Sequence, residues 1–240
     1  EGPETSICWG EPLSPAASAV AGALPAGGLS RLSDCNSFAS GPVLPEQDWL
    51  FYLESPADFT AYRKAMANLL ETTRSTFSHS LLSYSNADMT AFSKALCQLH
   101  WDLSSSERPS KPVVRFHFSP AGGDAGEYTR EAWDLLVDPQ LASRCLPADP
   151  AQWNFHLAVR TAQTLGIGNK WNHAKLTLSD DARAITGSVD TTRKELAVAL
   201  TGEAAVDAQS FYEEMWGTWH VHAACLSTEE SLCKHRKEWR

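Results

Sequence analysis

The stretch WNHAKLTLSD at residues 171–180, followed by ITGS at 185–188, decides the fold that we expect of this sequence. His173 and Lys175 stand two positions apart, and the residues from 176 to 178 alternate as strand residues do. Alternate residues of a strand lie on one face, so His173 and Lys175 should point the same way. Asp180 ends the strand, and residues 183–186 read as a returning strand. The stretch therefore predicts a β-hairpin.

The residue types in this hairpin suit the chemistry of a phosphodiester. Histidine changes charge near neutral pH and serves as a nucleophile or an acid. Lysine supplies a compact cation for the phosphoryl oxygens. Gly187 and Ser188 bring backbone and a small hydroxyl close to a phosphate without steric obstruction. Each residue alone has an ordinary structural explanation, but their joint spacing favours a phosphodiester site.

The pattern His-x-Lys-x4-Asp-x6-Gly-Ser resembles the HKD signature of the phospholipase D superfamily. The resemblance is strongest to the N-terminal half of the secreted, bacterial-type phospholipase D enzymes. There the motif follows Trp-Asn, as at Trp171 and Asn172, and precedes an ALTG segment, matched at 199–202. A helix with a Trp-x-x-Trp pattern follows, matched by Trp216 and Trp219. The resemblance implies an α/β fold with a mixed β-sheet flanked by helices on both faces.

The resemblance also implies roles for individual residues. His173 would attack phosphorus and form a phosphohistidine, Lys175 would bind the phosphate, and Asp180 would be a supporting carboxylate of the catalytic set. The residues expected to bind substrate are Trp171, Asn172, Gly187, Ser188 and Asp190. Position 190 departs from the family, which has Asn there, and a carboxylate cannot donate a hydrogen bond to phosphate. The two-histidine mechanism requires no metal and no cofactor.

The chain carries this motif once, whereas the family builds an active site from two copies. We therefore expect a companion chain with a second HKD motif, such as the processed C-terminal half of a longer enzyme. The basic end of the chain at Arg240 resembles a processing site. The alternatives are a homodimer that acts as an endonuclease or on another phosphodiester, and a non-catalytic binding or toxin subunit.

Charge and composition narrow the substrate class. The 240 residues carry a formal net charge of −9, which is a poor match for the clustered basic residues of nucleic-acid binding. A phospholipid is the expected substrate. No stretch approaches the ~20 apolar residues of a membrane span, so membrane contact would be peripheral. Aromatic side chains such as Trp171 are suited to such a surface.

The six cysteines indicate a secreted or extracytoplasmic protein with disulfide bonds. The chain begins at Glu1 rather than Met, which suggests a removed leader. Six cysteines permit 15 pairings, and the resemblance favours Cys225–Cys233. Sequential pairing adds Cys8–Cys35 and Cys97–Cys145. A zinc site is the alternative for the last two cysteines, which stand near His220, His222 and His235.

Two parts of the chain differ in composition. Residues 1–47 are rich in Pro, Gly, Ser and Ala and read as an extended segment packed on the domain. Residues 48–240 form the phospholipase D-like domain. Its pattern predicts helices at 57–73, 87–101, 126–137 and 203–219, and strands at 76–84, 113–118, 153–160 and 195–200. His79, His117 and His156 fall on predicted strands and are expected to be core or sheet histidines.

Overall fold

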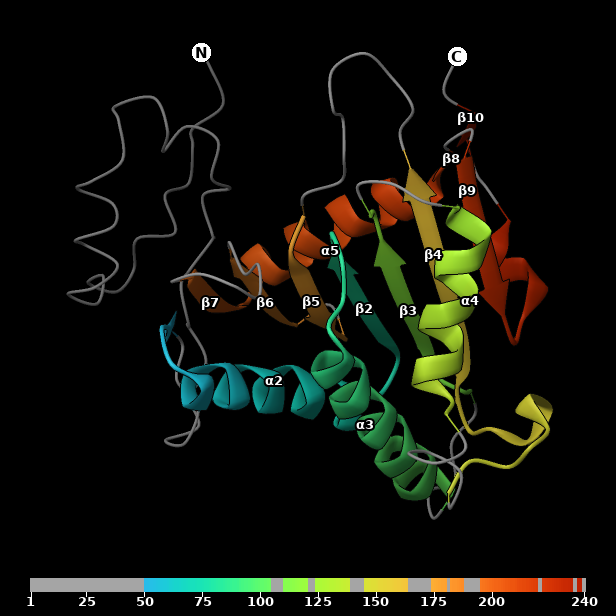
Figure 1. Cartoon of the computed structure of the whole chain (residues 1–240), viewed down its shortest axis with the longest axis horizontal. Coiled ribbons are helices and arrows are strands. Elements are labelled where there is room, and N and C mark those ends of the chain that lie inside the picture. The colour runs from blue at the N-terminus through green and yellow to red at the C-terminus, as the bar shows by residue number, and fades with distance from the viewer. Residues whose placement is uncertain are drawn as a thin grey trace, which may run out of the picture.

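An eight-stranded mixed sheet forms the centre of the molecule, with helices on both faces (Figure 1). The computed structural model describes residues 50–104, 110–120, 124–138, 145–163, 174–180, 182–187, 195–219, 222–234 and 237–238. The strand order is β1-β7-β6-β5-β2-β3-β4-β9. The α/β fold with a mixed sheet between two helical layers, predicted from the motif, is therefore confirmed.

The strands differ in direction across the sheet. Those of the large sheet are β1 (Leu50–Leu53), β2 (Thr76–Leu81), β3 (Val113–Phe118), β4 (His156–Gln163), β5 (Leu176–Ser179), β6 (Arg183–Gly187), β7 (Glu195–Thr201) and β9 (His222–Ser227). β2, β3 and β4 run parallel, and the other neighbouring pairs are antiparallel. A separate parallel pair consists of β8 (Thr218–Trp219) and β10 (Lys237–Glu238).

Three helices cover one face of the sheet, and one helix covers the other. α2 (Pro56–Glu71), α3 (Asn86–Ser104) and α4 (Ala125–Leu136) share a large apolar core with residues such as Phe77, Phe116 and Val159. α5 (Glu203–Gly217) packs on the opposite face through Ala205, Tyr212 and Trp216, against Leu176 and Leu178 of β5. In Figure 1, α4 lies in front of the sheet and α5 behind it. β5 therefore contributes its two leucines to the core layer under α5.

The predicted elements agree closely with the observed ones. α2 begins with a capping box in which Ser55 and Asp58 exchange hydrogen bonds, and Pro56 occupies its first turn. The predicted hairpin is β5 and β6, with Leu176 opposite Thr186. β4 begins three residues later than predicted, because Pro150–Gln152 forms a short 3-10 helix and Trp153 still lies outside the sheet.

Two strands of the large sheet, β1 and β9, were not predicted, and neither was the separate pair of β8 and β10. β1 is a four-residue edge strand that pairs with β7, and its place depends on a partner about 145 residues away in the chain. β9 pairs with β4, at the other edge of the sheet. Its sequence was interpreted as a histidine- and cysteine-rich tail. Short edge strands carry a weak pattern because one side of the strand has no neighbour.

Two of the three predicted disulfides are confirmed. Cys97 of α3 is bonded to Cys145, and Cys225 of β9 is bonded to Cys233 of the short helix η3 (Glu230–Cys233). Cys225 and Cys233 are therefore not thiolate ligands, which removes the zinc alternative built on them. Cys8 and Cys35 lie outside the described residues.

The boundary at residue 48 stays a prediction, because residues 1–47 lie outside the described residues. Within the described ranges, none of the helices has both the length and the apolar character needed to cross a membrane.

Candidate active site

The motif strand β5 lies in the middle of the sheet, between β6 and β2. Of the predicted site residues, Lys175, Asp180 and Gly187 lie within the described residues. The other predicted site residues, Trp171, Asn172, His173, Ser188 and Asp190, lie outside them. The geometry of the site is therefore built from the first three residues and from what surrounds them.

Lys175 immediately precedes β5 and is 8% exposed. Its carbonyl oxygen accepts a hydrogen bond from the backbone N–H of Gly187 at 3.4 Å and from the Thr186 hydroxyl at 3.1 Å. These contacts extend the β5–β6 hairpin by one residue. The hairpin thus brings the Lys175 and Gly187 parts of the motif, 12 positions apart in sequence, side by side.

Gly187 lies where β6 and β7 approach each other closely. A Cβ atom at this position would lie 2.2 Å from the carbonyl oxygen of Leu196 and 2.6 Å from the Cα of Ala197. These are backbone atoms of β7, so they cannot move aside cheaply. The close packing of β6 and β7 thus explains why a glycine is needed at position 187, independently of the predicted approach to phosphate.

Asp180 lies at the other end of β5 from Lys175. Its carboxylate accepts hydrogen bonds from the backbone N–H groups of Arg74, Ser75 and Thr76 at 2.7–3.1 Å, and from the Ser75 hydroxyl at 3.0 Å. Its backbone has φ 57°, in the left-handed region. A strand rises about 3.3 Å per residue, so about 16 Å separate Asp180 and Lys175 along the strand. The structure does not bring these two motif residues together, and Asp180 joins β5 to the connection between α2 and β2.

The face of β5 that looks toward α2 and α3 is polar. Thr177 Oγ1 forms a hydrogen bond with His79 Nδ1 of β2 at 2.9 Å, and Ser179 Oγ with Thr73 Oγ1 at 3.0 Å. Arg183 of β6 also donates to Ser179 Oγ at 3.1 Å. By the alternation of strand residues, the Lys175 side chain leaves on this same face. β5 is therefore held on this face by side-chain hydrogen bonds from three neighbouring segments.

His79 is the titratable member of this set. It is 2% exposed, and burial lowers the pKa of its imidazole to about 4, against the opposing effect of the nearby Asp88 carboxylate. His79 is therefore neutral at physiological pH. The prediction that it is a buried sheet histidine is confirmed. Its contact with the motif strand was not foreseen, because the partner, Thr177, is 98 positions away in sequence.

A second polar layer lies under α5 and was missed by the sequence analysis. Arg115 of β3 forms an ion pair with Glu213 of α5 and donates to Ser78 Oγ at 3.2 Å. Arg160 of β4, 1% exposed, donates to the carbonyl oxygen of Trp216. Both guanidinium groups lie within 6 Å of the Trp216 ring centroid.

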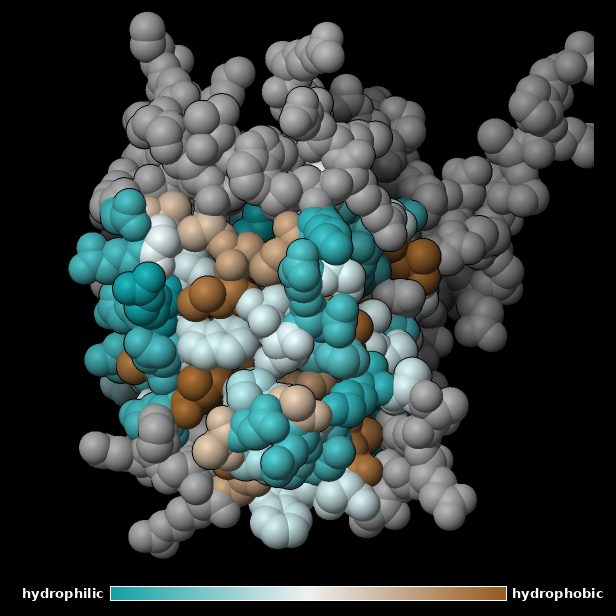
Figure 2. Space-filling view, turned by 90° about the vertical axis from the view of Figure 1, so that its right-hand side faces the viewer, coloured by the Kyte–Doolittle hydropathy of each residue, from teal (hydrophilic) through white to brown (hydrophobic). Residues whose placement is uncertain are grey.

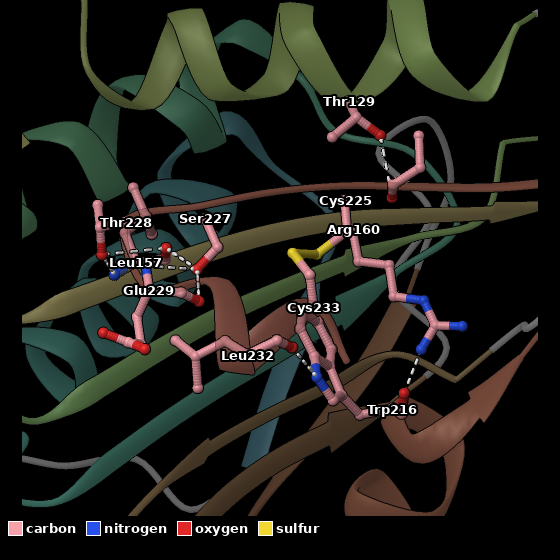
Figure 3. Close-up of a disulfide and its surroundings, with 11 residues drawn as sticks. Thr129, Leu157, Arg160, Trp216, Cys225, Ser227, Thr228, Glu229, Leu232 and Cys233 are labelled. Carbon is pink, nitrogen blue, oxygen red and sulfur yellow. Dashed lines mark hydrogen bonds between the residues drawn. A yellow bond between two sulfur atoms is a disulfide. The ribbon is translucent and has the colours of Figure 1, made fainter. Parts of the chain in front are cut away.

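Figure 3 shows how Trp216 connects this layer to the second disulfide. The Trp216 indole N–H donates to the carbonyl oxygen of Leu232 at 3.0 Å, next to Cys233. The Arg160 side chain reaches the opposite end of the same residue. Trp216, predicted from the Trp-x-x-Trp pattern, is therefore a buried anchor of the α5 C-terminus.

One hollow in the described surface lies on α4, away from the motif. Its lining residues are Glu127, Arg130, Glu131, Asp134, Leu135 and Asp138. Four of the six carry negative charge, which repels a phosphate. α4 packs on β4 and β9, which β2 and β3 separate from β5. Figure 2, which faces this side of the molecule, shows mainly hydrophilic side chains with small apolar areas between them.

No metal cluster is found in the described part of the chain: no three His, Cys, Asp or Glu side chains gather at a distance suited to a metal ion.

Comparison with known proteins gives structural neighbours only. No family model and no curated protein matches the sequence. NucT from Helicobacter pylori has a TM-score of 0.44 at 13% identity, over 69% of this chain and 92% of that protein. Nuc from Salmonella typhimurium, a phospholipase D family member, has a TM-score of 0.46 at 14% identity, over 74% and 95%. A phosphatidylserine synthase from Haemophilus influenzae has a TM-score of 0.40 at 10% identity, over 74% and 38%.

Proposed function

We propose that this protein is a phosphodiesterase of the phospholipase D type, which hydrolyses or transphosphatidylates phospholipid headgroups. The observation that carries the proposal is the adjacency of Lys175 and Gly187 at the end of the β5–β6 hairpin. His173 and Ser188 directly flank these residues in the motif. We assign the nucleophile to His173, the phosphate-binding cation to Lys175 and a small hydroxyl donor to Ser188, the groups that phosphoryl transfer requires.

The proposed reaction has two steps. An imidazole nitrogen of His173 attacks phosphorus, and the bond from phosphorus to the headgroup oxygen breaks to give a phosphohistidine. The Lys175 ammonium binds a non-bridging oxygen, while a second histidine donates a proton to the leaving alcohol. That histidine then takes a proton from water or an alcohol, which attacks phosphorus and releases His173. Trp171, Asn172 and Asp190 are assigned to the headgroup side of the site.

The second histidine is proposed to come from a companion chain with its own HKD motif. The sequence contains one motif, so the reaction above needs a donor from outside this chain. The net charge of −9 favours a lipid over a nucleic acid. The two disulfides support a secreted or extracytoplasmic site of action.

The test begins with protein purified in its native form together with any bound partner. Intact mass gives the chain composition, and three substrates are compared: phosphatidylcholine vesicles, bis(4-nitrophenyl) phosphate and single-stranded DNA. We expect choline release, and a loss of at least ~1,000-fold in His173→Asn. His156→Asn is the matched control, because His156 lies at the start of β4 outside the motif.

Trapping of the acid-labile phosphohistidine completes the test. A phosphoryl group on His173 of this chain supports the proposal. Cleavage of DNA alone by a complex of identical chains would replace it with an endonuclease. A chain that cleaves none of the substrates and traps no phosphoryl group is a binding subunit, which contradicts the proposal.

A further inference from the structure

His79 occupies a place where an apolar side chain would be expected. Its ring lies in a cluster of aromatic rings, with centroids 4.8 Å from Phe92, 5.7 Å from Phe116 and 6.3 Å from Phe118. Burial of an imidazole among these rings costs free energy that an apolar residue of similar size would not cost. The hydrogen bond with Thr177 offsets part of this cost. The position of its hydrogen-bond partner, Thr177, therefore indicates the role of His79.

Thr177 is the next residue on the same face of β5 as Lys175. The two positions are two residues apart, about 7 Å along the strand. On its other side, the Lys175 backbone is held by Gly187 and Thr186 of β6. β2 thus fixes the motif strand through a side chain just below Lys175, and β6 fixes it through the backbone of Lys175 itself.

We infer that His79 is a positioning residue for Lys175, which acts through Thr177 to set where the Lys175 ammonium meets a phosphoryl oxygen. The inference rests on the proposed function, because that function gives Lys175 a phosphate to bind. A phosphoryl oxygen must be met within a few tenths of an ångström for full stabilisation of the transition state. A slip or rotation of β5 about its axis moves the ammonium by more than that.

A matched control lies two residues beyond Thr177 on the same face of β5, at Ser179. Thr73 and Ser179 form a buried hydroxyl–hydroxyl hydrogen bond of 3.0 Å, and both residues are fully buried. Ser179 lies four residues from Lys175, about 13 Å along β5. Loss of either hydrogen bond should lower the stability of the protein by a similar amount. Only loss of the one between His79 and Thr177 should disturb Lys175.

The first experiment compares kcat and KM on bis(4-nitrophenyl) phosphate, with the native complex carrying each variant. We expect His79→Leu and Thr177→Val to lower kcat at least ~10-fold with little change in KM, and Ser179→Ala to change kcat less than ~2-fold. His79→Asn places an amide near the position of Nδ1 and should restore kcat to within ~3-fold. The double variant of His79→Leu and Thr177→Val should be no slower than either single variant.

The second experiment needs no catalysis. Competitive acetylation of amines, followed by mass spectrometry, gives the reactivity of Lys175 relative to the exposed Lys64 and Lys94. We expect the relative rate at Lys175 to change more than ~3-fold in Thr177→Val and His79→Leu, and to stay constant in Ser179→Ala. Thr177→Val keeps the shape of the side chain, so it tests the inference even where His79→Leu folds poorly.

The outcomes separate this inference from the proposed function. A wild-type protein that cleaves no phosphodiester, with Lys175 reactivity still dependent on His79, overturns the function and upholds the positioning role. An active wild-type protein in which Thr177→Val and Ser179→Ala have the same kcat and the same Lys175 reactivity overturns the positioning role alone.

Discussion

The carboxylate of Asp180 accepts the backbone N–H of Arg74 with both oxygens, at 2.8 and 2.9 Å, across 106 positions of sequence. Further donors from Ser75 and Thr76 complete the contact. The Asp180 carboxylate thus fastens the end of β5 that is remote from Lys175 to the connection between α2 and β2.

Replacement of Asp180 should lower stability more than it lowers the rate. Asp180→Ala removes the acceptor of several backbone donors and places alanine at φ 57°, so we expect a loss of about 3 kcal/mol. Asp180→Asn keeps one carbonyl oxygen and a residue that tolerates this backbone, so its loss should be about half as large. Urea unfolding measures both variants.

Activity of the Asp180 variants gives the complementary readout. If the carboxylate serves only the fold, Asp180→Asn retains kcat within ~10-fold below its melting temperature. If Asp180→Asn lowers kcat as much as His173→Asn does while stability is unchanged, Asp180 takes part in catalysis directly.

Gly187→Ala should destabilise the β6–β7 pair. The new Cβ would lie 2.2 Å from the Leu196 carbonyl oxygen, so the two strands must separate. We expect a loss of at least ~2 kcal/mol, and a loss of activity because Gly187 also contacts the Lys175 carbonyl oxygen. Thermal unfolding and turnover measure the two effects.

Gly126→Ala on α4 is the matched control. Its Cβ would meet no backbone atom and a single side-chain atom, Oδ1 of the N-cap residue Asp124, at 3.1 Å. Alanine favours a helix over glycine by about 0.5–1 kcal/mol, so this variant should be neutral or more stable. Equal destabilisation of both variants would show that the close approach at Gly187 is not the cause.

The sequence predicted those parts of the fold that depend on local pattern. The hairpin, the cap at Ser55 and the strand at Val113–Phe118 all follow from periodicity and turn chemistry within a short window. The partners of β1 and β9 could not be predicted, because edge strands gain their place from distant neighbours.

In the candidate site, too, local contacts could be predicted from the sequence and long-range contacts could not. The motif predicts which residues meet at the hairpin, since that contact is local. It does not reveal that Thr177 meets His79, or that Asp180 meets Arg74, because each pairing joins β5 to residues about 100 positions earlier. Hydrogen bonds between distant polar residues leave no periodic signal in a single sequence. The alternation at 176–178 predicts a polar face on this strand, but it does not predict the partners of that face.

Arg160→Met should cost more stability than Arg115→Met. Arg160 is 1% exposed, and its loss leaves the Trp216 carbonyl oxygen buried near the end of α5 without this donor. The partner of Arg115 is Glu213, whose side chain is 43% exposed and can be solvated by water. We expect about 3 kcal/mol for Arg160→Met and about half of that for Arg115→Met in chemical denaturation. The reverse order would mean that the Arg115–Glu213 pair, rather than Arg160, fastens α5.

Removal of the disulfide that closes the longer loop should destabilise the protein more than removal of the other. Cys97–Cys145 spans 48 positions and Cys225–Cys233 spans 8. Loop entropy predicts losses of about 4 and about 2.5 kcal/mol for the paired alanine variants. Urea unfolding under non-reducing conditions measures both. A larger loss at the short loop would show that its support of Leu232 and Trp216 outweighs chain entropy.

His79 should make the protein less stable in mild acid. The pKa of His79 falls from the ordinary 6.5 to about 4 on folding, because burial disfavours the charged imidazole. Below pH 6.5 the unfolded chain binds a proton that the folded protein does not bind until about pH 4. The contribution of neutral His79 to the free energy of unfolding is therefore fully present above pH 6.5. It is lost as the pH drops to 4, by roughly 3 kcal/mol in total. Asp88, itself paired with Arg63, is the charged group that acts on His79, and it limits the fall.

Denaturation of the wild type and His79→Asn between pH 7 and pH 4 isolates this contribution, since all other titrating groups are common to both. The asparagine variant keeps a hydrogen-bonding group for Thr177 and cannot bind the proton. We expect the two stability curves to converge as the pH falls, with most of the change between pH 6.5 and 4. Parallel curves over that range would mean that the imidazole titrates alike in the folded and unfolded protein, which is incompatible with its burial between β2, β5 and α3.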